Sequence, residues 1–131
     1  MIKEEYFTPG TIQEKSRELL ASVMTLREKH AGQVLEIHKA ALLVLDMQRY
    51  FLDPSAHAYI PSGPAILPGI QRMARAFEEK KRPVILTRHL NSPAEAGLMA
   101  KWWKDLIREE SPFSQVTSEL ESPGRMVIQK K

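Results

Sequence analysis

The sequence predicts an α/β fold, a three-layer αβα, Rossmann-like arrangement around a parallel sheet. Three short apolar runs, at residues 40–45, 83–87 and 126–129, lack the polar alternation of half-exposed strands and are typical of strands covered on both faces. Two segments with apolar residues at helical spacing, 64–81 and 93–109, separate these runs. Alternating strands and helices imply right-handed crossovers, and therefore a parallel sheet with helices on both faces.

The first 38 residues are expected to form an N-terminal extension with one helix, and residues 39–131 the main domain. Thr11 followed by Glu14 has the spacing of a capping box, and apolar residues then recur at helical spacing. Gly32 is suited to the position just beyond a helix end. We therefore expect a helix over residues 12–30, packed on its own domain or on a second subunit.

The elements of the main domain follow in order. The first strand stops abruptly at Asp46, and the connection over residues 50–63 is rich in proline, glycine and aromatic residues. Ordered loops of that length are often functional. After the helix over 64–81 and the second strand, the helix over 93–109 is expected to turn Leu98, Trp102 and Leu106 inward, with Trp103 as a further candidate for its inner face. A Ser-Pro-Gly turn then leads to the third strand.

Composition excludes several classes of protein. The 131 residues are 43% hydrophobic and 27% charged, which is ordinary for a globular domain. A net charge of +3, from interleaved basic and acidic residues, does not indicate nucleic-acid binding. No apolar run approaches the ~20 residues of a bilayer span, and the acidic N-terminus lacks the apolar stretch of a signal peptide. We therefore expect a cytoplasmic protein with no nucleic-acid or membrane partner.

The sequence gives no signal for a cofactor or a metal. The absence of cysteine excludes disulfides, zinc–thiolate sites and a cysteine nucleophile within this chain. The four histidines, His30, His38, His57 and His89, show no metal-binding spacing. Glycine-rich phosphate loops and the Gly-x-Ser-x-Gly motif are also absent. We therefore expect no cofactor and no metal ligand, and His89 is expected to lie in a loop or to support the site from behind the residues that contact the substrate.

The carboxyl ends of the three strands carry polar residues. In parallel sheets these ends share one edge, where ligands bind, and here they present Asp46, then Arg88 and His89, then Lys130. An acid that ends an apolar strand is partly desolvated, which prepares it for proton transfer, and a lysine beside it would orient the carboxylate. The alternatives are that Asp46 only caps a turn and that Lys130 belongs to a solvated tail.

Four motifs along the chain carry a family resemblance. Residues 41–51, Ala-Leu-Leu-Val-Leu-Asp-Met-Gln-Arg-Tyr-Phe, are an apolar strand that runs into Asp-Met-Gln and an aromatic pair. Residues 66–77 follow as a helix, residues 82–89 as a strand with a polar end, and residues 121–130 as a strand that closes on a lysine. In this order and with these gaps they resemble the isochorismatase-like (cysteine hydrolase) superfamily, over about residues 39–131.

This resemblance implies a six-stranded parallel sheet, of which this sequence holds the first three strands only. It also implies a catalytic trio of aspartate, lysine and cysteine. By position, Asp46 matches the aspartate and Lys130 the lysine, while Lys131 is one place off register. The candidate substrate-binding residues are Phe51, His89 and Trp102, although packing is the alternative role of Trp102.

The family contains two chemistries. In its amidases, the aspartate takes the thiol proton, the thiolate attacks a carbonyl or a carbon–nitrogen double bond, and backbone amides hold the oxyanion. In its isochorismatases, the aspartate protonates a vinyl ether, and the cysteine is not needed as nucleophile. Its nicotinamidases bind a metal through an acid and histidines after the second strand. Here residues 87–93 contain one histidine and no acid, which argues against that metal site.

The sequence departs from the family pattern because it stops at the lysine, before the cysteine-bearing half. We therefore expect the N-terminal half of a hydrolase for a small amide, ureido or vinyl-ether substrate, inactive by itself. The alternatives are a non-catalytic half-domain that serves assembly, and one chain of a two-chain enzyme. In either case the first strand, from Ala40 to Asp46, is an unprotected sheet edge. It is expected to pair with a second copy or a complementary chain, or to be covered by the N-terminal helix.

Overall fold

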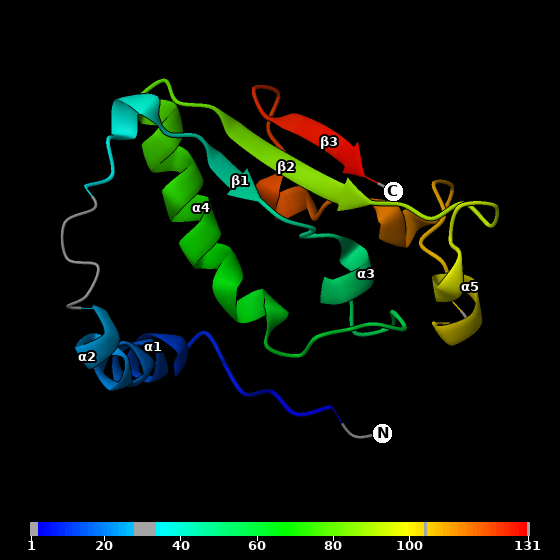
Figure 1. Ribbon diagram of the computed structural model, residues 1–131, viewed down its shortest axis with the longest axis horizontal. Helices are drawn as coiled ribbons and strands as arrows, with labels where there is room; N and C mark the ends of the chain where they lie inside the picture. The colour runs from blue at the N-terminus through cyan, green and yellow to red at the C-terminus, as the bar shows by residue number, and fades with distance from the viewer. Residues whose placement is uncertain (1–2, 28–33, 104, 131) are drawn as a thin grey trace.

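A three-stranded parallel sheet forms the centre of the computed structural model, which describes residues 3–27, 34–103 and 105–130 (Figure 1). The strand order is β1-β2-β3, and both pairings are parallel. The strands are β1 (Leu42–Val44), β2 (Val84–His89) and β3 (Met126–Lys130). The prediction of a parallel α/β sheet is therefore confirmed, with β1 shorter than expected and β2 and β3 longer.

Helix α4 (Gly63–Glu79) packs against one face of the sheet, as predicted for residues 64–81 (Figure 1). Pro64 lies in its first turn, where the missing N–H costs nothing. The main core lies between this helix and the strands, with Leu120 closing it from the 3₁₀ helix η4 (Ser118–Leu120). Its buried members are Val44, Met47, Leu67, Ala74, Val84, Leu86, Val116 and Leu120.

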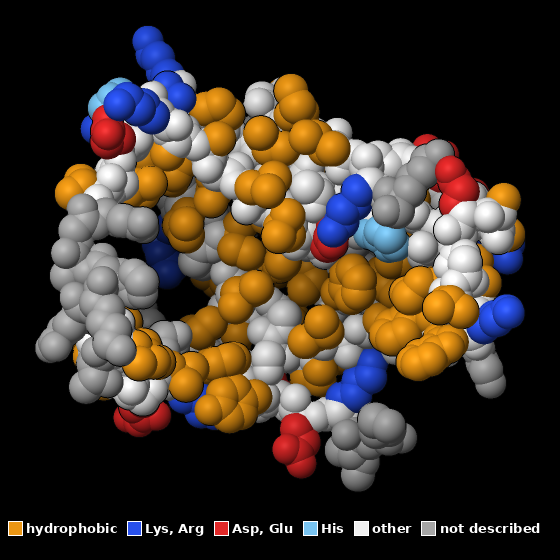
Figure 2. Space-filling view, in the orientation of Figure 1, with side chains coloured by type: hydrophobic (Ala, Val, Ile, Leu, Met, Phe, Trp, Pro, Cys, Tyr) orange, Lys and Arg blue, Asp and Glu red, His pale blue; other side chains and the backbone are white. Residues whose placement is uncertain are grey.

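The opposite face of the sheet is exposed in the described part of the chain. The strand register places Leu43, Ile85 and Met126 in one row, and of these Leu43 and Met126 are exposed. Ile128, two residues along from Met126, is exposed as well. Figure 2 shows hydrophobic side chains gathered over the strands on the face toward the viewer. The expectation of strands covered on both faces therefore holds for one face only.

The N-terminal helix is shorter than predicted and is interrupted. It forms α1 (Ile12–Ser22) and α2 (Met24–Arg27), with a break at the β-branched Val23. The capping box is not formed, because the Thr11 hydroxyl accepts a hydrogen bond from the Thr8 N–H instead. Residues 28–30 and Gly32, the predicted end of this helix, lie outside the described residues. Helix α1 lies beside α4 across a hollow of about 580 Å³, and it leaves Leu43 exposed.

The helix predicted over residues 93–109 is wrong in its length. Only α5 (Leu98–Trp102) is helical in that stretch. Gly97 precedes it with a positive φ of 50°, a conformation that suits glycine and interrupts the helix. Beyond α5, the backbone of Ile107 pairs with Asn91, which draws the chain out of helical geometry. Leu98 and Trp102, predicted to face inward, are exposed.

Two short elements connect the core to the strand ends. Helix α3 (Arg49–Leu52) follows β1 after a turn over residues 45–48, and the 3₁₀ helix η3 (Pro112–Ser114) packs against it. Backbone hydrogen bonds from Arg49 to Gln115 and from Thr117 to Met47 join the two segments. The remaining 3₁₀ helix, η2 (Ile37–Lys39), leads into β1. The carboxyl ends of the strands are thereby held between α3 and η3.

Candidate active site at the carboxyl ends of the strands

Asp46 stands where β1 gives way to a sharp turn. Its φ of 51° lies in the left-handed region, which aspartate tolerates better than most residues. The Gln48 N–H donates to the Asp46 carbonyl at 2.7 Å and closes the turn. Sparsely populated backbone conformations of this kind are concentrated at functional sites. The turn explains why the strand stops at the acid, and it turns the chain toward α3.

The hydroxyl of Thr87 holds the Asp46 carboxylate in place. Thr87 Oγ1 donates to Asp46 Oδ1 at 2.7 Å and accepts from the Asp46 N–H at 3.1 Å. Thr87 is buried on β2, the neighbouring strand. A residue of a rigid strand therefore holds both the carboxylate and the backbone N–H of Asp46. The sequence signal for Thr87 was a single polar residue in an otherwise apolar strand, but no role was predicted for it.

Lys130 contacts the second oxygen of the same carboxylate. Its Nζ lies 2.6 Å from Asp46 Oδ2, and both side chains are partly exposed. Lys130 is the register partner of His89, so the two residues stand side by side on one face of the sheet. In Figure 2 an acidic, a basic and a histidine side chain lie together near the strand ends. The strands thus bring Asp46, His89 and Lys130 to one edge, as the topology predicted.

The side chain of Gln48 holds the backbone of His89 through hydrogen bonds. Its side chain is fully buried, and its Oε1 accepts from the His89 N–H at 2.7 Å. Its Nε2 donates to the carbonyls of His89 at 2.9 Å and Ser114 at 2.8 Å. A buried amide that makes three hydrogen bonds joins β2 to η3 without leaving a polar atom unpaired. The sequence motif included Gln48, but this positioning role follows only from the fold.

The other two candidate substrate-binding residues, Phe51 and Trp102, do not share the hydrogen-bonded surroundings of Asp46. Phe51 packs against a second cluster formed by the buried Tyr50, Leu90 and Ile107, next to the end of β2. Trp102 is 83% exposed on α5, and the structure does not bring it to Asp46 and Lys130. The neighbouring Trp103 is 40% exposed, and its Nε1 donates to the Tyr50 hydroxyl at 2.8 Å.

The Tyr50 hydroxyl connects α3 to the segment around Trp103 and Asp105 through hydrogen bonds. It lies 3.0 Å from the Asp105 carbonyl and 3.1 Å from Asp105 Oδ2, so it donates to Asp105 while it accepts from Trp103. Burial raises the pKa of Tyr50 to about 12, and the Asp105 carboxylate adds to this rise. The phenol therefore stays protonated at neutral pH and ties the loop after α5 to α3.

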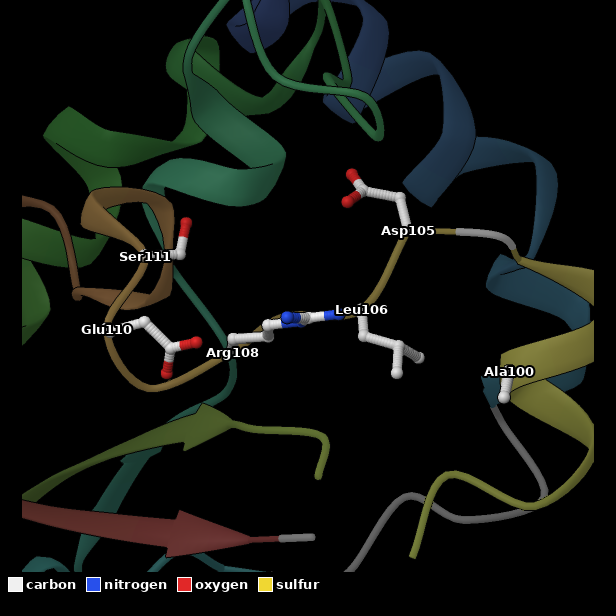
Figure 3. Close-up of a pocket in the computed structure, with 6 residues that line it drawn as sticks. All are labelled: Ala100, Asp105, Leu106, Arg108, Glu110 and Ser111. Atoms are coloured by element: carbon white, nitrogen blue, oxygen red, sulfur yellow. The ribbon is translucent and has the colours of Figure 1, made fainter. Parts of the chain in front are cut away.

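A separate hollow of about 460 Å³ lies beside this loop (Figure 3). Asp105, Arg108 and Glu110, which follow α5 in the chain, supply its charged walls, and Ala100 lies on α5 itself. Among the described residues, its lining does not include Asp46, His89 or Lys130. We therefore place the candidate site at the strand ends, where the acid and the lysine meet, and not in this hollow.

The described residues contain no group of three or more histidine, cysteine or acidic side chains that could hold a metal ion. Within the same described ranges, no helix is long and apolar enough to cross a membrane. At the carboxyl ends of the strands, the geometry offers a carboxylate paired with an ammonium group. Such a pair can move a proton at the carboxylate and stabilise an anion at the lysine.

Solved structures that are longer than this chain share the fold over part of their length. A cysteine hydrolase from Pseudomonas syringae pv. phaseolicola 1448A superposes with a TM-score of 0.64 at 21% identity, over 73% of this chain and 48% of that one. The N-carbamoylsarcosine amidase from Thermoplasma acidophilum gives 0.60 at 21% identity, over 69% and 50%. The pyrazinamidase of Pyrococcus horikoshii, in complex with zinc, gives 0.56 at 26% identity, over 69% and 50%.

The chain thus spans about half the length of the solved structures that it resembles. No curated protein matches it. The model of the Isochorismatase domain family matches residues 40–131, which include both Asp46 and Lys130. On this match, which covers more than half of the sequence, the chain belongs to the isochorismatase domain family.

Proposed function

We propose that this chain supplies the aspartate and the lysine of a hydrolase site for a small amide, ureido or vinyl-ether substrate. The observation that carries the proposal is the 2.6 Å contact between Lys130 Nζ and Asp46 Oδ2 at the carboxyl ends of parallel strands. Two hydrogen bonds between Thr87 and Asp46 support it, because Thr87 Oγ1 donates to the carboxylate and accepts from the Asp46 N–H, which fixes the residue from both sides. Preorganised charge of this kind is what a transition state needs.

For an amide or ureido substrate, the third group is a thiol from outside these 131 residues, which contain no cysteine. Asp46 would take the thiol proton, and the thiolate would add to the carbonyl carbon. The carbon–nitrogen bond would then break as Asp46 returns the proton to the departing nitrogen, and water would release the acyl group from the sulfur and restore the thiol. Lys130 would balance the negative charge that builds up beside it. For a vinyl ether, a protonated Asp46 would instead deliver its proton to the double bond, and water would complete the cleavage without a thiol.

The named activities of similar structures agree with the amide and ureido alternatives. The matched structures include an N-carbamoylsarcosine amidase and a pyrazinamidase, whose names describe small amide and ureido substrates. We favour metal-independent amide or ureido hydrolysis over the zinc-containing type, because residues 87–93 contain one histidine and no acid.

We also propose that the site is completed by a second polypeptide segment that pairs with β1. In a parallel pair only alternate residues face the neighbouring strand, so Leu43 presents its N–H and carbonyl to the free edge. An apolar groove of about 340 Å³ runs along this edge, between β1 and the Ile66, Ile70 and Met73 side chains of α4. A strand that brings a cysteine would fit this edge. A second copy, or assembly without catalysis, is the alternative.

The test compares the purified chain with a completed one. The completed form fuses the chain, through a Gly/Ser linker, to the part of the Pseudomonas cysteine hydrolase that it does not cover. Both are assayed with isochorismate, N-carbamoylsarcosine and pyrazinamide. We expect no steady turnover by the chain alone and measurable turnover of the ureido or amide substrate by the fusion. Turnover of isochorismate by the chain alone would contradict the need for a second segment and favour the aspartate-only chemistry.

A further inference from the structure

The side chain of His89 is held by Asn91, two residues along the chain. The Asn91 Nδ2 and the His89 Nε2 lie 2.9 Å apart. The backbone of His89 is fixed independently, because the buried Gln48 bonds both its N–H and its carbonyl. A histidine that is anchored at the backbone and at the ring can adopt few orientations. This degree of restraint is typical of a side chain that has a task at a site.

The direction of the hydrogen bond to His89 follows from the other end of Asn91. Asn91 Oδ1 accepts from the Ile107 N–H at 3.2 Å, and the Asn91 N–H donates to the Ile107 carbonyl at 2.8 Å. A backbone N–H can only donate, so the carboxamide oxygen must face Ile107 and the NH₂ must face His89. His89 Nε2 therefore accepts, which requires a neutral ring with its proton on Nδ1.

The ring stands among the residues of the candidate site. Thr87 and His89 are alternate residues of β2 and share one face of the sheet, on which Lys130 is the register partner of His89. Thr87 in turn bonds Asp46. In the described part of the chain, no hydrogen bond engages His89 Nδ1. Its N–H is therefore free to donate to a molecule bound at the strand ends.

We propose that Asn91 is a positioning residue that holds His89 as the neutral Nδ1–H imidazole, and that this N–H binds a carbonyl or carboxylate oxygen of the substrate beside Lys130. The ligand part of this inference rests on the proposed hydrolase function, whereas the state of the ring does not. The ammonium of Lys130 and the imidazole N–H are both donors. Together they select a substrate that presents oxygen acceptors to this side of the site and disfavour one that presents an amine.

The state of the ring can be measured in the unchanged 131-residue chain. Long-range ¹H–¹⁵N correlation spectra at about pH 8, above the ordinary histidine pKa of ~6.5, show which ring nitrogen carries the proton. We expect the proton of His89 on Nδ1. A proton on Nε2 in the unchanged chain would overturn the inference, whatever the variants show.

Two variants separate positioning from simple packing. Asn91→Asp keeps an oxygen for the Ile107 N–H but replaces the donor that faces His89 with an acceptor, so the His89 proton should move to Nε2. The control Ser92→Ala removes the neighbouring hydroxyl bond to Glu95, and it should leave the His89 tautomer unchanged. An unchanged tautomer in a folded Asn91→Asp variant would contradict the positioning role.

The ligand part is tested with acetate as an oxygen-acceptor probe and methylammonium as a donor probe. Acetate should shift the His89 Nδ1 and Lys130 side-chain signals, and the His89 shift should fall several-fold in Asn91→Asp. Methylammonium should shift neither signal. No His89 response to acetate, or an equal response to methylammonium, would overturn the ligand part. Because the tautomer is measured without turnover, its outcome is independent of the hydrolase assay.

Discussion

The two faces of the sheet differ although the same apolar runs build both. On the face toward α4, Val44 is 5% exposed and Leu86 1% exposed. On the other face Leu43 is 53% exposed, although it lies between two residues that contact the core. Apolar side chains on both faces of a strand indicate burial on both faces. We therefore expect the open face and the β1 edge to be covered by a segment that the described residues do not include.

Truncation of a side chain should be costly on the covered face and nearly neutral on the open one. Leu86→Ala removes a fully buried side chain between α4 and the strands and should lower the free energy of unfolding by about 3 kcal/mol. Leu43→Ala, on the exposed face of β1, should change it by less than about 0.5 kcal/mol when the chain is dilute enough to be dissociated. Urea unfolding of both variants measures the difference. Equal losses would show that the open face is buried in solution.

Removal of the Thr87 hydrogen bonds should cause the second largest loss in the free energy of unfolding. Thr87→Val keeps the shape of the side chain but removes the bonds to the Asp46 carboxylate and N–H. Because one partner is charged, we expect a loss of about 2 kcal/mol in the free energy of unfolding. In an Asp46→Ala background the same change should cost less, since the acceptor is already gone. Identical losses in both backgrounds would mean that the two side chains are not coupled.

Association tests the open face directly. We expect the chain to associate at micromolar concentration, and Leu43→Lys to weaken this association at least tenfold, or about 1.4 kcal/mol, because lysine blocks an edge strand. Leu98→Lys, an exposed leucine changed on α5, is the matched control and should have no effect. Sedimentation measures both. A sharp monomer of the unchanged chain, with slowly exchanging Leu42 to Val44 amides, would refute the uncovered-edge interpretation.

The smallest expected effect on stability concerns the ion pair between Glu78 of α4 and Arg125, which precedes β3. Arg125 donates to both Glu78 oxygens, at 2.7 and 3.1 Å, and this contact lowers the pKa of Glu78 below its ordinary value of 4.5. A lowered folded pKa gives stability that is present above pH 4.5 and is lost as the pH falls through the folded value. Glu78→Gln should cost about 0.5 kcal/mol at pH 7, because the pair is partly exposed.

The Glu78 effect should disappear on acidification. Below the pKa of Glu78 the wild-type carboxyl is neutral, so wild type and Glu78→Gln should unfold alike at that pH. Glu79→Gln changes the exposed neighbouring acid and provides the control at both pH values. A Glu78→Gln loss that persists unchanged in acid would show that packing, and not charge, connects α4 to the turn before β3.

The sequence was most informative where local pattern and fold agree. The apolar runs predicted all three strands within two or three residues at each end, and helical spacing predicted α4. The abrupt end of the first run at Asp46 identified the acid, since a parallel sheet gathers its strand ends on one edge. These predictions needed only periodicity and topology, which are local or nearly local properties.

What the sequence did not predict depends on contacts between distant residues. Thr87 and Gln48 take their roles from partners 41 residues away, and such pairs follow only from the strand register. Helical spacing over residues 93–109 was misleading because Gly97 and the pairing of Asn91 with Ile107 override it. The sequence favoured Trp102 for the inner face of this helix, yet in the structure it is Trp103 that bonds Tyr50.

The central claim, that Asp46 transfers a proton at a hydrolase site, is tested most directly by Asp46→Asn in the fused enzyme. Asparagine tolerates the left-handed turn and keeps an oxygen for Thr87, so the fold should survive. We expect kcat to fall by at least ~10²-fold while stability stays within about 1 kcal/mol. Asp53→Asn, which removes a comparable pair with Arg49, should leave kcat unchanged. Near-normal turnover by Asp46→Asn would contradict the catalytic role and leave Asp46 as a turn residue.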